Sequence, residues 1–174
     1  QDYYGQNHFK DHANANGIYA GNDTIDGGEG DDWINAGGGN DVVKGGAGSD
    51  EIWGGDGNDT IDGEAGDNWI DGGSGSDTIT AGDGNDTISG GSGTNTIYGD
   101  AGDDTITSNG EGDIVDAGDG NNTIIIGSDA HGGEFTSGDG NDSYVIEEGA
   151  TGIFTITSGT GNDEYIINKF DGND

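Results

Sequence analysis

The chain has 174 residues, of which 41 are glycine and none is proline, cysteine or methionine, and its formal net charge is -33. This charge excludes nucleic acid and anionic membrane surfaces as partners, because both are recognised by clustered lysine and arginine, and it makes cations the natural partners. The lack of cysteine excludes disulfides and thiolate metal sites, and no apolar run approaches the ~20 residues of a membrane span, so we expect no membrane insertion by this segment.

Residues 1–20 carry no repeat, and we expect them to form an N-terminal cap or linker. Terminal units of repeat proteins need a covering that shields their core. The candidates for that covering are the aromatic residues Tyr3, Tyr4, Phe9 and Tyr19.

Residues 21–125 repeat every nine residues in the pattern Gly-Gly-x-Gly-x-Asp-x-U-x, where U is a large aliphatic residue, as in "GGDGNDTID" at 54–62. We number these positions as columns one to nine. Glycines in columns one, two and four predict a turn over the first six columns, and the polar–apolar–polar alternation of the last three predicts a short strand. Column eight supplies one buried side chain per repeat and recurs without a slip at Ile25, Ile34, Val43, Ile52, Ile61, Ile70, Ile79, Ile88, Ile97, Ile106, Val115 and Ile124.

A turn and a strand in every repeat, with no helical stretch, predict an all-β solenoid. Two repeats make one coil with a strand on each side, so the twelve repeats of 21–125 predict six stacked coils.

The repeat resembles the RTX, or hemolysin-type, calcium-binding nonapeptide. The resemblance implies a right-handed parallel β-roll with two nonapeptide repeats per coil. It also implies a protein of a Gram-negative-type bacterium that leaves the cell unfolded by type I secretion and folds on binding extracellular Ca²⁺. Its location would be extracellular, either secreted or at the cell surface.

Column six is the candidate metal-ligand column. Carboxylates stacked every ~4.8 Å along one edge repel each other unless a cation lies between them, and Ca²⁺ prefers oxygen ligands. A role in turn capping alone is the alternative, but it leaves the charge unexplained. The candidate carboxylates are Asp23, Asp32, Asp41, Asp50, Asp59, Asp77, Asp86, Asp104 and Asp113, with weaker ligands at Asn68, Asn95 and Asn122.

In the resembling family each ion lies between successive turns on one edge, held by column-six residues of repeats n and n+2 and by glycine carbonyls. The Asp–Asp pairs would be 23/41, 32/50, 41/59, 59/77 and 86/104, and the pairs with one Asn would be 50/68, 68/86, 77/95, 95/113 and 104/122. These pairs imply roughly ten calcium ions. Pair 95/113 is the weakest, because the repeat at 108–116 lacks the usual glycines. The implied carbonyl ligands are Gly28, Gly30, Gly37, Gly39, Gly46, Gly48, Gly55, Gly57, Gly66, Gly73, Gly75, Gly82, Gly84 and Gly102.

All three tryptophans, Trp33, Trp53 and Trp69, fall in outward columns of even-numbered repeats in successive coils. They should therefore share one outer face. Clustered exposed aromatic residues mark an interface with a protein or glycan partner, or packing against a neighbouring segment of the same protein.

Residues 126–174 change period. The segments "TSGDGNDSYVI" at 136–146 and "TSGTGNDEYII" at 157–167 match at a spacing of 21 residues, which predicts longer, irregular coils that continue past the end. Asp142 and Asp163 take the column-six place, so a further calcium site is expected there.

No nucleophile–base pair or phosphate-binding loop is present, so we expect no enzymatic activity. We expect instead a calcium-binding structural module of a secreted or cell-surface protein of the adhesin, surface-layer or matrix type. The alternative is the calcium-folding C-terminal region of a type I-secreted enzyme or toxin.

Overall fold

Parallel strands in two sheets make up the computed structural model, which describes residues 7–8, 14–16 and 21–168 and contains no helix in these ranges. Nothing in this part of the chain is therefore a long apolar helix able to cross a membrane. The aromatic residues expected to cap the N-terminal end lie outside the described residues.

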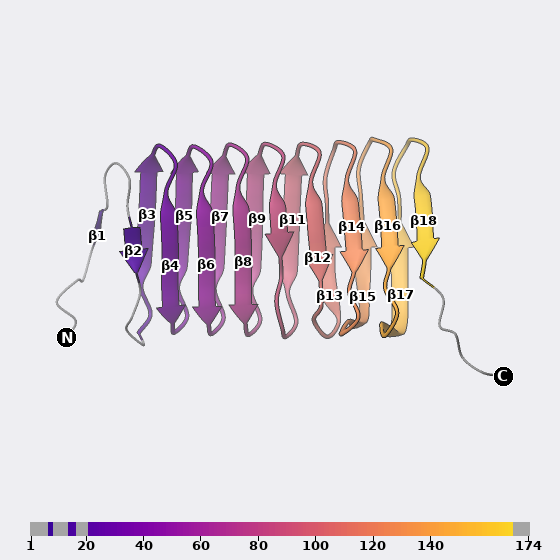
Figure 1. Ribbon diagram of the computed structural model, residues 1–174, viewed down its shortest axis with the longest axis horizontal. Helices are drawn as coiled ribbons and strands as arrows, with labels where there is room; N and C mark the ends of the chain where they lie inside the picture. The colour runs from indigo at the N-terminus through magenta and orange to yellow at the C-terminus, as the bar shows by residue number, and fades with distance from the viewer. Residues whose placement is uncertain (1–6, 9–13, 17–20, 169–174) are drawn as a thin grey trace.

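The two sheets face each other, and the chain crosses from one to the other at every turn (Figure 1). Odd-numbered strands form the first sheet: β1 (Asn7–His8), β3 (Thr24–Glu29), β5 (Val42–Ala47), β7 (Thr60–Ala65), β9 (Thr78–Asp83), β11 (Thr96–Ala101), β13 (Asp113–Asp116), β15 (His131–Thr136) and β17 (Thr151–Thr157). Even-numbered strands form the second: β2 (Asn14–Asn16), β4 (Trp33–Gly38), β6 (Glu51–Asp56), β8 (Trp69–Ser74), β10 (Thr87–Ser89), β12 (Thr105–Ser108), β14 (Thr123–Ile126), β16 (Ser143–Ile146) and β18 (Glu164–Ile167). This arrangement confirms the predicted all-β solenoid with two repeats per coil.

The strand register follows the repeat. Between β3 and β14 each residue pairs with its equivalent in the next coil, as Ile52 does with Ile70 and Thr96 with Ile114. After that the coils lengthen: Ile124 pairs with Tyr144, which in turn pairs with Tyr165. The register between β15 and β17 shifts at a bulge between His131 and Gly133.

The strands are longer than the sequence predicted. From β3 to β11 all strands except β10 run over six residues, from column seven through column three of the next repeat, as in Thr60–Ala65. The predicted six-residue turn is therefore wrong, and only columns four to six bend. The reason is that columns two and three still pair with the adjacent coils and continue the ladder, as Gly55 does by pairing with Gly37 and Gly73.

The core is a stack of column-eight side chains, all of them buried as predicted. Column one also faces inward, and its residues are small. A Cβ at Gly54 would lie 3.2 Å from Cδ1 of Ile61 and 2.6 Å from Oδ2 of Asp59, which explains the preference for glycine there. The remaining columns lie in the turns or face solvent. The column-six side chains are therefore buried at the edges of this narrow core.

Candidate metal centres

Column six lies at the end of each turn, immediately before the next strand begins. Every column-six residue from Asp32 to Asp142 is buried, whereas Asp23 and Asp163, at the two ends of the series, are partly exposed. Buried carboxylates are rare in proteins unless they are paired or bind a metal. A regular row of them along each edge of the roll therefore needs a chemical explanation.

From Asp41 to Asp163, the Oδ1 atom of each column-six residue accepts a hydrogen bond from the backbone of the preceding coil. Oδ1 of Asp59 accepts the backbone N–H of Asp41 at 2.8 Å, and Oδ1 of Asp77 accepts that of Asp59 at 2.8 Å. The same bond recurs along both edges at 2.7–3.1 Å. Column-six residues eighteen apart, which the resemblance pairs through an ion, are thus brought into direct contact within the regular block.

The second carboxylate oxygen is different. Seven of these aspartates have a buried Oδ2 with no hydrogen-bond partner among the described residues: Asp41, Asp50, Asp59, Asp77, Asp86, Asp104 and Asp142. Leaving a buried polar atom unpaired costs about 1–3 kcal/mol, and more for a charged group. A bound cation would remove this cost.

The pKa values of the column-six aspartates also favour a cation beside them. Burial raises the pKa of Asp41, Asp77 and Asp86 to about 6, and that of Asp104 to about 7. Carboxylates of adjacent coils add to the effect, as Asp59 and Asp23 do for Asp41, while the backbone hydrogen bond opposes it. Burial at the edge of the apolar core therefore disfavours the anionic form of these carboxylates unless a positive charge lies close to them.

The backbone around each aspartate supplies further oxygen atoms. All fourteen glycines predicted as carbonyl ligands have a positive φ. Column-four carbonyls point along the roll: a Cβ on Gly57 would overlap the carbonyl oxygen of Gly39 in the preceding coil. Carbonyl oxygens and column-six side chains are thus gathered between successive turns, where the resemblance places the ion.

Asn122 shows which atoms surround the tip of a column-six side chain. Its Nδ2 donates to the carbonyl oxygens of Gly118 at 3.1 Å and Gly120 at 3.4 Å, which are columns two and four of its own turn. An aspartate in the same place would direct an oxygen toward two further oxygens. Such an all-oxygen arrangement fits Ca²⁺, which takes carboxylate and carbonyl oxygens together.

Carboxylates alone do not build these sites. No group of three or more His, Cys, Asp or Glu side chains within the described part of the chain is arranged to hold a metal ion. Each site would combine column-six side chains with glycine carbonyls. This composition explains why the glycine columns and the aspartate column occur together.

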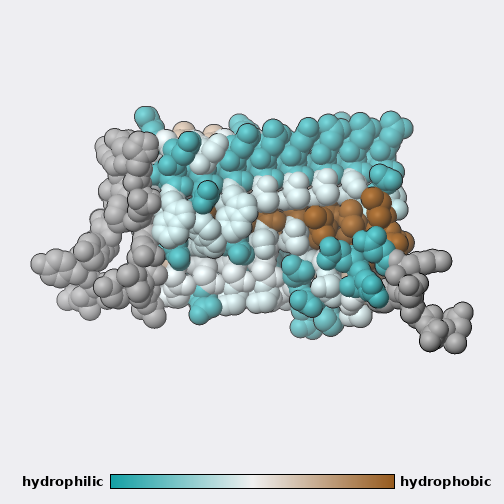
Figure 2. Space-filling view, in the orientation of Figure 1, coloured by the Kyte–Doolittle hydropathy of each residue, from teal (hydrophilic) through white to brown (hydrophobic). Residues whose placement is uncertain are grey.

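A second polar ladder, in column five, was missed by the sequence analysis. Asn40 Oδ1 accepts the N–H of Asn58, and Asn58 Oδ1 accepts that of Ser76, each from the coil that follows. The ladder continues along the other edge through Asp67, Asn85, Asp103 and Asn121. Figure 2 shows hydrophilic residues in regular rows along the upper turn edge. The enrichment of Asn, Asp and Ser in column five was the available signal.

The three tryptophans lie on one outer face, on the neighbouring strands β4, β6 and β8. Ring centroids of Trp33 and Trp53 are 5.2 Å apart, and those of Trp53 and Trp69 are 4.9 Å apart, with the rings tilted by 53° and 49°. Trp33 and Trp53 are half-buried and Trp69 is 36% exposed. We call these three residues the tryptophan ladder.

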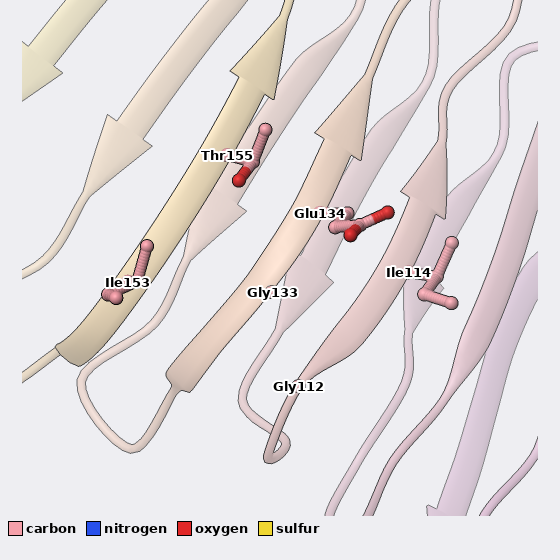
Figure 3. Close-up of a pocket in the computed structure, with 6 residues that line it drawn as sticks. All are labelled: Gly112, Ile114, Gly133, Glu134, Ile153 and Thr155. Carbon is pink, nitrogen blue, oxygen red and sulfur yellow. The ribbon is translucent and has the colours of Figure 1, made fainter.

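A shallow depression lies on the outer face of β13, β15 and β17 (Figure 3). Glu134 is the only titratable group among its lining residues, which also include the exposed side chains of Ile114 and Ile153. Within this depression no second titratable group stands beside Glu134 to form an acid–base pair.

Comparison with known proteins supports the calcium assignment. No curated protein matches the chain. Six overlapping segments match the family described as the RTX calcium-binding nonapeptide repeat, namely residues 19–52, 36–70, 44–79, 53–88, 62–97 and 89–124. Together these segments cover 19–124, well over half of the chain. The chain therefore belongs to the RTX calcium-binding nonapeptide repeat family.

Proposed function

We propose that this chain is a structural module that folds on binding extracellular Ca²⁺, in a secreted or cell-surface bacterial protein of the adhesin, surface-layer or matrix type. The observation that carries the proposal is the row of seven buried Oδ2 atoms without a partner. Without cations, these carboxylates and the net charge of -33 oppose compaction. With cations, the binding free energy becomes folding free energy, because the unfolded chain holds no site.

Calcium titration tests the proposal. In excess chelator we expect the circular dichroism of a largely unfolded chain, and added Ca²⁺ should produce a cooperative β-sheet signal with a midpoint of ~0.1–1 mM, the range of extracellular calcium modules. Calorimetry should give a stoichiometry of several ions per chain. Magnesium at the same concentration is the control, because its small octahedral shell suits these carbonyl-rich sites poorly. A full β-sheet signal in chelator would refute the coupling.

The alternative assignment is the calcium-folding region of a type I-secreted enzyme or toxin. Both assignments use the same residues of this chain. The absence of an acid–base pair in the depression of Figure 3 favours the structural role. The sequence of the complete gene separates the two, since a protease, lipase or pore-forming region on the same chain would favour the alternative.

We propose in addition that the tryptophan ladder is a docking surface for a basic segment of a partner protein. Acidic residues are interleaved with its rings: Glu51 pairs in register with both Trp33 and Trp69, and Asp71 pairs with Trp53. A lysine or arginine over a tryptophan face beside a carboxylate gains a cation–π contact and an ion pair together. The tilt between neighbouring rings also makes the ladder a poor flat platform for a sugar.

Changing all three tryptophans to serine tests the docking surface. In calcium and physiological salt, we expect the variant to bind a hexa-arginine peptide at least tenfold more weakly than the unchanged protein. Thr60, Thr78 and Thr96 lie on the opposite sheet, and their triple serine variant is the matched control. Calcium-induced circular dichroism verifies that both variants fold. Equal peptide binding by all three proteins would exclude a basic partner, and selective loss of binding to a neutral oligosaccharide would assign the face to a glycan.

A further inference from the structure

Asn122 occupies a column-six position, and both polar atoms of its side chain have partners within the protein. Its Oδ1 accepts the N–H of Asp104 at 2.9 Å, as an aspartate in this column would. Its Nδ2 donates to the carbonyl oxygens of Gly118 and Gly120, which face the tip of the side chain. The amide nitrogen is thus a positively polarised group at the place where seven other turns present an unpartnered carboxylate oxygen. The side chain of this turn therefore leaves no carboxylate oxygen without a hydrogen-bond partner.

Asp113, in the preceding turn on the opposite edge, is also complete. Its Oδ1 accepts the N–H of Asn95 at 2.7 Å. Its Oδ2 accepts the hydroxyl of Ser108 at 2.6 Å and the N–H of Gly110 at 3.1 Å. Ser108 and Gly110 belong to the repeat that departs from the usual glycine pattern. That departure therefore has a function: the unusual turn supplies donors to the oxygen that is left without a partner in seven other turns.

The core also changes character after this point. From β14 onward the single aliphatic residue per repeat is joined by Ile126, Phe135 and Tyr144, all fully buried. The Phe135 and Phe154 rings lie 6.2 Å apart, and Tyr144 stacks on Tyr165 at 5.3 Å. Full burial of a large side chain contributes roughly 1.5–3 kcal/mol. The core of β14 to β16 therefore holds larger apolar side chains than the core of the regular repeats.

Tyr144 shows that the larger core is also satisfied in its polar groups. Its hydroxyl donates to Ser137 Oγ at 2.8 Å, and the same bond recurs one coil later between Tyr165 and Ser158 at 2.9 Å. Asp142 is the one column-six residue of this region with a buried Oδ2 that has no partner among the described residues. Within the described part of the chain, the region from 108 onward thus has one buried carboxylate oxygen without a partner, against six in the region before it.

We infer that the series of calcium sites is interrupted at Asp113 and Asn122, where protein donors replace the ion, and that the coils from β13 to β18 stay folded without calcium. This inference rests on the proposed calcium-dependent folding of the preceding repeats. The chain then has two parts: a calcium-dependent roll before residue 108, and a calcium-independent end on which that roll can assemble coil by coil.

Hydrogen exchange on the full chain, read by mass spectrometry of peptides, tests the inference. In chelator, peptides from 123–157 should exchange at least tenfold more slowly than peptides from 42–104. In calcium both sets should be protected. Uniformly fast exchange in chelator, with full protection in calcium, would overturn the inference and leave the proposed function standing. Protection of 42–104 in chelator would instead overturn the proposed calcium dependence, and with it the contrast between the two parts.

The substitution Asn122→Asp isolates the role of the amide. It should abolish the protection of 123–157 in chelator, calcium should restore that protection, and the number of bound ions should rise by at least one. Asn85→Asp is the matched control, because it adds the same charge in column five, where Asp67 and Asp103 already occur on the same edge. The control should change neither the exchange nor the ion count. An unchanged ion count and unchanged protection in Asn122→Asp would show that the amide does not stand in for an ion.

Discussion

Replacing Asp59 with alanine should raise the calcium concentration required for folding by at least tenfold. Asp59 would contribute to two candidate sites, one toward Asp41 and one toward Asp77. Its Oδ1 also accepts the buried N–H of Asp41 at 2.8 Å, so truncation leaves that donor without a partner. An unpaired buried donor costs about 1–3 kcal/mol, and each 1.4 kcal/mol is a factor of about ten in an equilibrium constant. Some destabilisation should therefore persist even in saturating calcium.

Asp59→Asn separates the two contributions. An asparagine keeps the acceptor, as Asn68 does by accepting the N–H of Asp50 at 2.9 Å, but removes the ionised oxygen. We expect a smaller shift of the calcium midpoint and little loss of stability at saturation. Asp83→Asn is the control, because Asp83 is exposed in column three and loses the same charge. The measurement is the circular dichroism midpoint against free calcium, and equal midpoints for Asp59→Ala and Asp83→Asn would exclude column six as the ligand column.

Gly57→Ala should destabilise the calcium-saturated roll by roughly 2–6 kcal/mol, taking strain and overpacking together. Gly57 has φ +134°, a backbone conformation that side chains rarely adopt. Its new Cβ would also overlap the carbonyl oxygen of Gly39 and lie 2.6 Å from the carbonyl carbon. Both atoms are backbone atoms in the adjacent coil, so relief requires the coils to move apart. That movement would also disturb the carbonyl ligands.

Gly112→Ala is the matched control for this prediction. Gly112 also has a positive φ, +74°, but a Cβ there would meet no atom within 4 Å. Only the left-handed strain of about 1–2 kcal/mol should appear. Urea unfolding in saturating calcium compares the two variants. An equal loss of stability would mean that contact between turns contributes nothing and that backbone conformation alone requires the glycine.

The fold could be predicted in unusual detail because each column has one physical task. The unbroken nine-residue spacing of residues such as Ile61 and Ile70 required a repeating unit, and no other period fits it. The strand ends could not be predicted, because Gly54 and Gly55 have the composition of a turn but lie within strand β6. Their conformation is imposed by the ladder with Gly37 and Gly73 in adjacent coils, which is a property of the assembled roll.

The candidate site was predictable in its residue types but only partly in its contacts. The column-six aspartates were evident from sequence, whereas the division of seven of these carboxylates into a bonded Oδ1 and an unpartnered Oδ2 depends on the register between coils. The same is true of the bonds made by Ser108 and Asn122. In the sequence, both residues are departures from the repeat pattern, Ser108 in column one and Asn122 in column six. In three dimensions, they supply the donors that the other turns lack.

The eighteen-residue offset between paired strands, as from Ile52 to Ile70, also sets a mechanical property. Each folded coil adds only ~4.8 Å to the length of the roll. The same eighteen residues in extended form span roughly 60 Å, so every coil that opens under tension lengthens the chain more than tenfold. A module of this construction is short when its coils are folded. Under tension it can lengthen in steps, each step being the unfolding of one coil.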